Sequence, residues 1–337
     1  MGAINQSPPA AAVAIAASAG GVDAIRAFVA ELPSDFRAAV LIVLHIPPAG
    51  PSVLPAILSR VGRLPAEHPT DGEPLQAGIV YVAPPDQHMF VSDAQVRVVS
   101  GPRENGHRPA ADVLFRSVAE HFGPRSAGVV LSGTMDDGAA GLRAVRTVGG
   151  LALVQDPAEA AFPGMPLAAI DEANPHVVGG VGVLAEHLRK WVTELPDISS
   201  EPDVTGLVND PPRSGSLTPL TCPECGGTLW QHVDYGAERF RCRVGHTYSA
   251  DGLMVGKQAA LESALWAAIV ALEERADVSR RIVQRLNVTG RASQLERYRT
   301  EISESEKRAR VLRDLMNDLV QGVSMSHNED IHGNAAS

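Results

Sequence analysis

Long apolar runs are missing from this sequence of 337 residues. No uninterrupted apolar stretch reaches the ~20 residues that a helix needs to cross a bilayer, so we expect no membrane insertion. The first ten residues contain two prolines and no basic residue, which argues against a secretory signal peptide. Both absences together predict a cytoplasmic protein.

Basic residues are outnumbered, since 29 Lys and Arg stand against 39 Asp and Glu, for a formal net charge of −10. Neutralising phosphates requires a basic surface, so this balance argues against general nucleic-acid binding, and we expect no nucleic-acid partner. The apolar fraction of 45% is ordinary for a globular protein. The length suffices for one large domain plus one or two small ones.

Cysteine is also scarce: the chain has three, all between Cys222 and Cys242. An odd, clustered set indicates metal binding rather than a disulfide framework. With His246 the cysteines form the pattern C-x2-C…C-x3-H, which is typical of a tetrahedral zinc ribbon. We expect Cys222, Cys225, Cys242 and His246 to hold a structural zinc ion, because four protein ligands leave no position open for catalysis. The alternative is a reduced set of buried cysteines without metal.

Apolar strands alternate with amphipathic helices from residue 13 to about residue 195. Continuous apolar runs predict buried strands over 11–17, 38–44, 127–131 and 151–154, and shorter, more solvent-facing strands over 79–83 and 95–99. Helical spacing predicts helices over 22–32, 112–122 and 139–148. This alternation predicts an α/β fold with a doubly wound, mostly parallel, Rossmann-like sheet.

Composition divides the chain into six predicted parts. They are a disordered N-terminus over 1–10, the α/β domain over 11–195, a Pro/Ser/Asp/Gly-rich linker over 196–216, a zinc-ribbon-like module over 217–250, a helical hairpin over 251–322 and a disordered polar tail over 323–337. The hairpin either packs on itself or on the module, or it serves self-association or the docking of a protein partner.

Ser18 lies where the first predicted strand gives way to the first predicted helix. Gly20 and Gly21 permit a tight turn and the close approach of a substrate. The helix N-terminus presents free N–H groups and a positive dipole end, which favour negative charge. This arrangement suits a nucleophile and equally a phosphate cradle, although a serine at such a position is more often a helix cap or turn residue.

Three candidate catalytic groups follow the carboxyl ends of predicted parallel strands, where sites form in doubly wound sheets. Ser18 offers a nucleophile, and His45, which ends the second strand, offers a general base. The loop after the strand at 127–131 offers two carboxylates, Asp136 and Asp137, to orient that base. Each residue alone has a structural explanation, but the coincidence of three at one sheet edge favours a serine hydrolase.

Six stretches of the chain, from residue 13 to about residue 188, resemble in order the catalytic domain of CheB-type protein-glutamate methylesterases. They are AIAASAGGVDAI, VLIVLHIPP, GIVYVAPPDQHMF, ADVLFRSVAEHFG, GVVLSGTMDDGAAGL and VQDPAEAAFPGMPLAAI. The resemblance implies hydrolysis of glutamate γ-methyl esters on the cytoplasmic helices of methyl-accepting chemoreceptors, with release of methanol. Many members of the family also deamidate receptor glutamines.

The resemblance also implies the roles of individual residues. It makes Ser18 the nucleophile, His45 the base and Asp137 the orienting acid, because the family's acid directly precedes the glycine of the DGAAG stretch. It implies no cofactor for catalysis. We expect the backbone N–H groups of Ala19 and of Thr134 and Met135 to hold the oxyanion. The loop GTM at 133–135 departs from the family's more usual Gly-Met-Gly.

Two further expectations concern His88 and the control of activity. His88, in the APPDQHM stretch, either lines the site or is a structural histidine. The best-known members carry an N-terminal receiver domain, of about 120 residues, but only about a dozen residues precede the first strand here. We therefore expect control by expression, a partner or the C-terminal half.

A different class of function remains open: a non-catalytic regulatory or scaffold protein of a sensory pathway. In that case the hydrolase domain and the zinc and helical module would serve only to bind partners. The complete triad favours the enzyme, because a domain kept only for binding has no need of all three residues.

Overall fold

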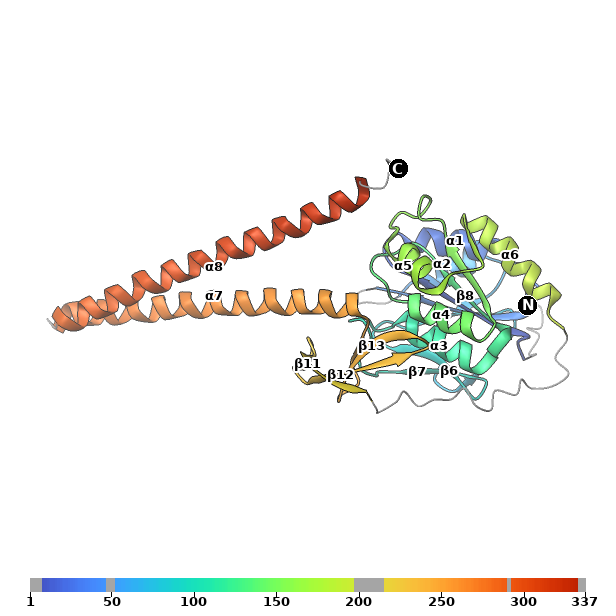
Figure 1. The fold of residues 1–337 in the computed structure, drawn as a ribbon, viewed down its shortest axis with the longest axis horizontal. Helices are drawn as coiled ribbons and strands as arrows, with labels where there is room; N and C mark the ends of the chain where they lie inside the picture. Colours follow the sequence, from blue (N-terminus) through green and yellow to red (C-terminus); the bar gives the residue numbers. More distant parts are fainter. Residues whose placement is uncertain (1–7, 47–51, 197–214, 290–291, 333–337) are drawn as a thin grey trace. The chain divides into compact units, whose positions relative to one another are not determined.

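The computed structural model describes residues 8–46, 52–196, 215–289 and 292–332 (Figure 1). The chain forms two compact units, Met1–Met254 and Val255–Ser337. Most of the predicted linker, residues 197–214, lies outside the described residues, as do 1–7 and 333–337 of the predicted disordered ends.

A seven-stranded sheet runs through the first unit in the order β10-β9-β8-β1-β2-β5-β3, and every neighbouring pair is parallel. Its strands are β1 (Ala11–Ala17), β2 (Ala38–Leu44), β3 (Ala66–Glu67), β5 (Val80–Val82), β8 (Ser126–Val130), β9 (Leu151–Gln155) and β10 (Val177–Gly179). The predicted doubly wound, parallel α/β fold is confirmed. The chain builds outward from β1 in both directions, so the carboxyl ends of β1, β2 and β8 form the switch point where such sheets place their sites.

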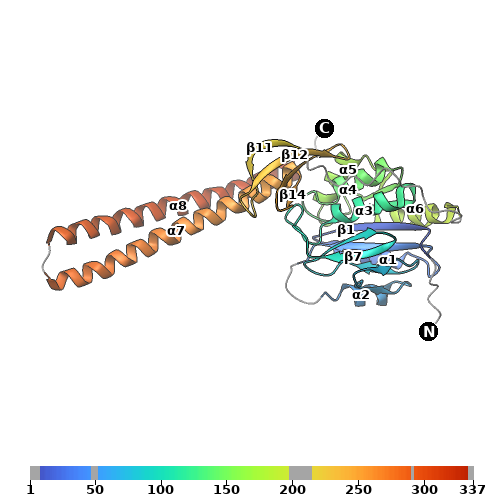
Figure 2. The ribbon, with the colours of Figure 1, turned by 90° about the horizontal axis from the view of Figure 1, so that it is seen from below.

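Helices cover both faces of this sheet, as Figure 2 shows for α3 to α5 on one side and α1 and α2 on the other. The first layer comprises α3 (Ala111–Phe122), α4 (Ala139–Thr147) and α5 (Gly164–Ala173), and the second α1 (Gly21–Ala30), α2 (Leu54–Val61) and α6 (Val181–Glu194). A short 3-10 turn, Gly123–Arg125, follows α3. Alternate residues of β1 enter the two cores, which explains its continuous apolar sequence.

One sequence prediction about the strands is wrong. The sequence predicts a more solvent-facing strand at 79–83, yet Val80, Tyr81 and Val82 of β5 are buried. The reason is position, because β5 lies inside the main sheet between β2 and β3. The strand at 95–99 is half-exposed as expected, and it belongs to a separate antiparallel sheet of β4 (Glu73–Pro74), β7 (Gln95–Val99) and β6 (His88–Ser92).

A small four-stranded antiparallel sheet contains the three cysteines. Its strands are β11 (Ser216–Thr221), β12 (Thr228–Asp234), β13 (Ala237–Cys242) and β14 (Thr247–Tyr248). Tyr235 and Gly236 join β12 to β13 with positive φ values of 48° and 82°, the conformation of a two-residue hairpin turn. We call residues 215–254 the cysteine module; its description as a zinc ribbon stays a prediction.

Two long helices, α7 (Ala250–Thr289) and α8 (Ala292–His332), make up the second unit apart from the first residues of α7. They lie side by side and antiparallel (Figure 2), and ion pairs join Arg275 to Glu301 and Arg280 to Glu306. The helix α8 continues through ten residues of the predicted tail, a stretch that contains no proline to end it.

One described helix meets the length and composition of a membrane span: α7, over Ala250–Leu286, of whose most apolar window 11% is buried. A single helix of this kind is weak evidence for insertion. The absence of membrane insertion stays a prediction.

Burial in the sheet makes the first testable prediction. Leu41 lies in β2 with no exposed surface, so Leu41→Ala should lower the free energy of unfolding of the α/β domain by about 2–5 kcal/mol through lost apolar burial and a residual cavity. Urea denaturation followed by circular dichroism measures this change. Leu167→Ala, at a side chain that is 50% exposed, is the control and should change stability by less than about 0.5 kcal/mol. Equal losses in both variants would contradict the prediction.

Candidate active site

Ser18 occupies the sharp turn between β1 and α1. Its N–H donates to the carbonyl of Ser132 at 3.0 Å, which ties the turn to the end of β8. Gly20 has a φ of 68°, and a Cβ there would come within 2.7 Å of the Ala161 Cβ, so this position requires glycine. The half-buried Ser18 is thus held at the sheet edge by backbone contacts alone, and its Oγ has no hydrogen-bond partner among the described residues.

His45 follows β2, next to Ser18. Ala17 and Leu44 are register partners, so the two residues that follow them lie at the ends of adjacent strands. His45 Nε2 is 2.8 Å from Asp137 Oδ2. Nδ1 of the same ring is buried and has no partner among the described residues. This nitrogen is therefore the one available to exchange a proton with Ser18.

Asp137 is the carboxylate that the structure brings to His45. Its side chain is 1% exposed, and its oxygens accept hydrogen bonds from the backbone N–H groups of Ala111 at 2.6 Å and Asp112 at 3.2 Å. Burial alone raises the pKa of Asp137, but the hydrogen bond and charge of His45, together with the Ala111 N–H, outweigh it and hold this pKa well below its usual range. The two N–H groups open α3, so Asp137 also caps that helix.

Asp136, the other candidate carboxylate, makes its contact with the cysteine module. Its pKa is raised by burial and by the neighbouring Asp137 charge, against a hydrogen bond with Ser249 of the cysteine module. The structure therefore places Asp137, rather than Asp136, beside the base.

A second histidine covers the base. The rings of His45 and His107 are stacked, with centroids 4.0 Å apart and planes 5° from parallel. Burial, reinforced by the nearby His45, lowers the pKa of His107 to about 4. His107 is therefore neutral at pH 7, and its ring packs against the His45 ring without adding charge.

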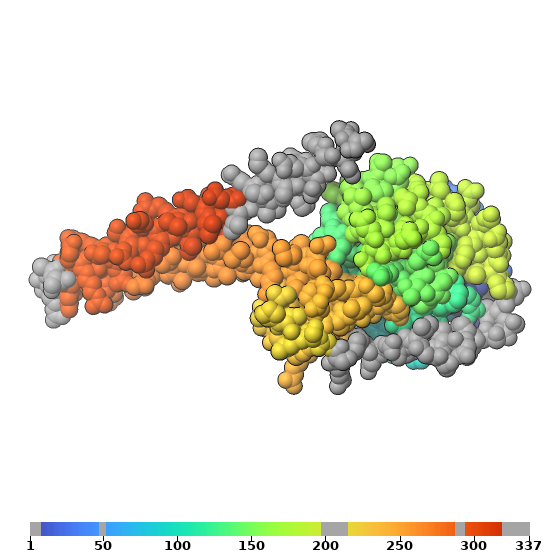
Figure 3. All heavy atoms as spheres, viewed as in Figure 1, coloured from blue at the N-terminus to red at the C-terminus, as the bar shows by residue number. Residues whose placement is uncertain are grey.

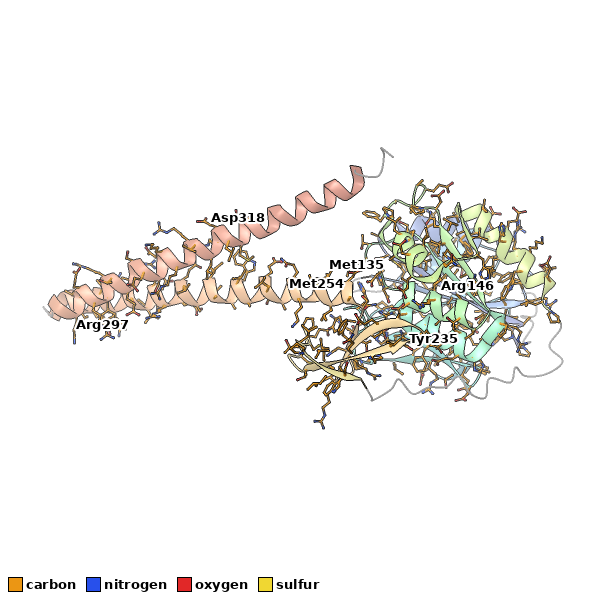
Figure 4. All side chains as sticks on the ribbon, in the orientation of Figure 1. Met135, Arg146, Tyr235, Met254, Arg297 and Asp318 are labelled. Atoms are coloured by element: carbon orange, nitrogen blue, oxygen red, sulfur yellow. The ribbon has the colours of Figure 1, made fainter. Side chains whose placement is uncertain are left out.

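The predicted oxyanion donors are Ala19, directly after Ser18, and two residues that follow Gly133, where an added Cβ would lie 3.0 Å from Ser18 Cβ. The loop between β8 and α4 contains Thr134 and Met135, the latter labelled in Figure 4 and held at a φ of 67°. Among the described residues, the N–H groups of Ala19, Thr134 and Met135 donate no hydrogen bond, whereas that of Gly133 donates to the Phe162 carbonyl. The three predicted donors are thus free to bind a developing negative charge.

His88 is buried in β6, and backbone groups occupy both of its ring nitrogens. Nε2 lies 2.9 Å from the Pro102 carbonyl oxygen, and Nδ1 accepts from the N–H of Ala110 at 3.3 Å. Neither nitrogen is left for a substrate, and the contacts hold the segment that leads into α3.

Sequence reasoning missed His107, Asn105 and Asp112, which all surround the triad. The only local signal is the Asn105-Gly106 pair, which marks a turn. The spacing of residues does not predict that this turn packs against the end of β2. The contact between His107 and His45 joins segments that are far apart in the chain.

The predicted metal ligands also come together. The ligand atoms of Cys222, Cys225, Cys242 and His246 all lie within 4.8 Å of one another, so this cluster is able to hold a metal ion. Sγ of Cys222 and Sγ of Cys242 lie 3.6 and 3.5 Å from His246 Nδ1. Glu224 Oε2 lies 3.2 Å from the other nitrogen of His246, as a carboxylate that orients a ligating histidine does.

A doubly wound α/β sheet with a serine, a histidine and an aspartate at its switch point has the residue set of a serine hydrolase. The chain belongs to the CheB methylesterase family, whose model matches residues 13–188. The resemblance inferred from the sequence is confirmed. All three triad candidates lie within the matched residues, and the cysteine module lies outside them.

Individual relatives agree with this assignment. The chain is 36% identical over 184 residues to "Protein-glutamate methylesterase/protein-glutamine glutaminase 2" of Koribacter versatilis, covering 53% of this chain and 51% of that protein. It is 39% identical over 192 residues to a Yersinia pestis protein with the same name but no number, covering 56% and 53%. The chain spans about half the length of the curated relatives it matches.

A solved structure matches the same part of the chain. The CheB methylesterase catalytic domain of Thermotoga maritima superposes with a TM-score of 0.52 at 28% identity, over 54% of this chain and 98% of that one.

The half-buried ring of His107 predicts a pH dependence of stability. The pKa of His107 falls from 6.5 unfolded to about 4 folded, so between these values the unfolded chain binds a proton that the folded chain does not. The contribution of His107 to the free energy of unfolding should therefore be fully present above pH 6.5. It should be lost as the pH falls to 4, a loss of about 3 kcal/mol. His107→Phe keeps a stacked ring without titration and should not show this loss, as urea midpoints at a series of pH values will measure. If the stability of wild type and of His107→Phe depended on pH in the same way, His107 would not be the titrating group. His187→Gln, at an exposed histidine, is the control and should keep the wild-type pH dependence.

Proposed function

We propose that this chain is a protein-glutamate methylesterase that hydrolyses glutamate γ-methyl esters on the cytoplasmic helices of methyl-accepting chemoreceptors. The observation that carries the proposal is the hydrogen bond of 2.8 Å between His45 and the buried Asp137, beside a serine on the adjacent strand end. The names of the relatives support this activity, and they support deamidation of glutamines as a second reaction of the same site. A cytoplasmic location follows from such a substrate.

The proposed reaction begins when Ser18 Oγ attacks the γ-carbonyl carbon and its proton passes to His45. Nδ1 receives it, because Nε2 is engaged by Asp137. The ionised Asp137 stabilises the imidazolium that forms. The N–H groups of Ala19, Thr134 and Met135 bind the oxyanion, and one such donor is typically worth ~3 kcal/mol.

The intermediate then collapses: the bond to the methoxy oxygen breaks, and methanol leaves with the proton from His45. Water attacks the acyl-enzyme at the same carbonyl carbon, with His45 again taking a proton. The bond to Ser18 Oγ breaks, Oγ regains its proton and the free glutamate is released. No cofactor takes part in this sequence.

The triad predicts the effect of three substitutions on methanol release from a methylated chemoreceptor fragment. Ser18→Ala should abolish acyl-enzyme chemistry, and Asp137→Asn should lower kcat roughly 10³- to 10⁴-fold because the base loses its charged partner. Asp136→Asn is the matched control and should stay close to wild type. A larger loss in Asp136→Asn than in Asp137→Asn would refute the assigned acid.

Labelling with a fluorophosphonate separates the enzyme from a scaffold protein that only binds partners. Wild type should be labelled and Ser18→Ala should not. A folded wild type that is neither labelled nor able to release methanol would favour the regulatory role.

We propose further that the cysteine cluster binds one structural zinc ion. Zn–S bonds of about 2.3 Å place tetrahedral ligand atoms roughly 3.8 Å apart, and the distance of 3.6 Å between Sγ of Cys225 and of Cys242 agrees with that spacing. Three thiolates and one imidazole are ligands that zinc prefers, and they fill its coordination sphere. A small sheet with few apolar core residues needs such a link, which supplies on the order of 10 kcal/mol in small zinc domains.

Elemental analysis of the purified protein should find one zinc per chain. His246→Ala should lose the metal, and the thermal stability of the module should fall, because a ligand and its link between β13 and β14 are removed. His187→Ala, at an exposed histidine outside the cluster, should keep both. A metal-free wild type with unchanged stability after chelation would contradict the site.

A further inference from the structure

One buried arginine of the cysteine module reaches the back of the candidate active site. Arg239 of β13 is 2% exposed, and its Nη2 lies 2.5 Å from Asp112 Oδ2. Asp112 has no exposed surface, and its other oxygen accepts hydrogen bonds from the N–H groups of Gly138 at 3.0 Å and Gly141 at 2.6 Å. Those N–H groups belong to the turn and helix that directly follow Asp137. Asp112 therefore ties the segment of the catalytic acid to α3, and Arg239 is its ionic partner.

A second contact joins the module to a loop of the α/β domain, residues 103–107, which we call the Asn105 loop. The N–H of Asn105 donates to the Thr247 carbonyl at 2.8 Å, and the Ser249 N–H donates to Asn105 Oδ1 at 2.8 Å. The amide Nδ2 of Asn105 faces Asp112 Oδ2 at 3.3 Å and Asp137 Oδ1 at 3.5 Å. The same loop ends at His107, whose ring stacks on the base. The module therefore holds the loop that contacts both the acid and the base.

Charge explains why an arginine is needed at this place. Asp112, Asp137 and Glu104 are all buried, and Glu104 is already paired with Arg116 at 2.7 Å. Burial, together with the charges of Asp137 and Glu104, raises the pKa of Asp112 to about 6 against the opposing Arg239 charge. Without Arg239, one buried carboxylate would lack a counter-charge and would take up a proton. It would then accept the hydrogen bonds of the Gly138 turn less strongly, because charge-assisted bonds are the stronger ones.

The candidate metal ligands sit close to both contacts in the chain. Cys242 ends the strand β13 that contains Arg239, and His246 directly precedes Thr247. Arg239 and Thr247 thus lie on the two neighbouring strands, β13 and β14, that the cluster links.

We propose that Arg239 is a positioning residue of the active site, through which the cysteine module fixes Asp137 by way of Asp112 and, together with the Asn105 loop, holds the His45–Asp137 pair in its reactive geometry. The proposal rests on the proposed esterase function. Arg239 touches neither substrate nor reacting atoms. It acts through Asp112, so its loss should slow the chemical step rather than weaken substrate binding.

A second attachment of the module provides the matched control. Tyr235, labelled in Figure 4, donates to Glu120 Oε1 at 3.3 Å. Glu120 lies two helical turns further along α3 than Asp112, about 12 Å away along the helix axis. In Figure 3 the module, yellow to orange, borders the green surface of the α/β domain. Tyr235→Phe removes a contact that attaches the module but leaves Asp112 and Asp137 untouched.

The experiment compares full-length wild type, Arg239→Met, Arg239→Lys and Tyr235→Phe, each checked for metal content and thermal unfolding. The readouts are kcat and KM for methanol release and the low-field proton resonance of the His45–Asp137 hydrogen bond. In Arg239→Met we expect kcat to fall roughly 10- to 100-fold with KM unchanged, and the resonance to shift or broaden. Arg239→Lys should recover part of kcat because it restores the charge, and Tyr235→Phe should match wild type in both readouts.

Asn105→Gly is the second variant, should Arg239→Met fail to fold. Asn105 has a φ of 51°, so glycine keeps its backbone while removing the amide that faces Asp137. Here too kcat should fall with KM unchanged.

Two outcomes would overturn the proposal. One is a folded, metal-loaded Arg239→Met with wild-type kcat and an unshifted resonance. The other is an equal loss in Tyr235→Phe, which would mean that attachment of the module in general, and not Arg239, matters. If wild type itself releases no methanol, the proposed function fails, but the proton resonance of the His45–Asp137 hydrogen bond still tests the role of Arg239. A change of this resonance in Arg239→Met alone supports the positioning role. No change refutes it.

Discussion

Keeping the buried carboxylate of Asp137 ionised is the constraint on which the candidate site depends. A carboxylate removed from water takes up a proton unless nearby donors and positive charge compensate it. Here the first N–H groups of α3 and the ring of His45 supply that compensation. The same contacts fix where α3 begins and how the His45 ring is oriented, so one set of hydrogen bonds both stabilises the Asp137 charge and sets the geometry of the candidate site.

Further contacts hold the residues next to Asp137 and His45 in place. Asp112 binds the backbone that follows Asp137, and Arg239 in turn compensates Asp112. His107 stacks on His45 and stays neutral at pH 7 because partial burial lowers its pKa. The buried charge of Asp112 needs a partner of opposite charge, and Arg239 of the cysteine module supplies it. The module is therefore part of the buried structure of the α/β domain, because Arg239 of the module neutralises the charge of Asp112.

The second unit has a different physical character. Its two antiparallel helices are joined by surface ion pairs, such as that of Arg280 with Glu306, and by a narrow seam of buried residues that includes Ile269 and Ala309. Surface ion pairs contribute little stability individually. Side chains such as Trp266 and Val311 remain exposed, so the hairpin buries much less apolar surface than the sheet does.

The amino-acid sequence was enough to predict the parallel sheet, the order of its main elements and the strand ends that hold the candidate triad. Ala11–Ala17 and Ala38–Leu44 are predictable to the residue because strands buried on both faces need continuous apolar runs. The C-x2-C…C-x3-H pattern likewise marks the cluster, since its ligands are close in sequence. The tertiary structure was needed to show that β5 is internal, that Asn105 and His107 contact Asp137 and His45, and that Arg239 pairs with Asp112 behind them. These depend on contacts between segments far apart in the chain, and such contacts leave no periodicity or local spacing by which a sequence could reveal them.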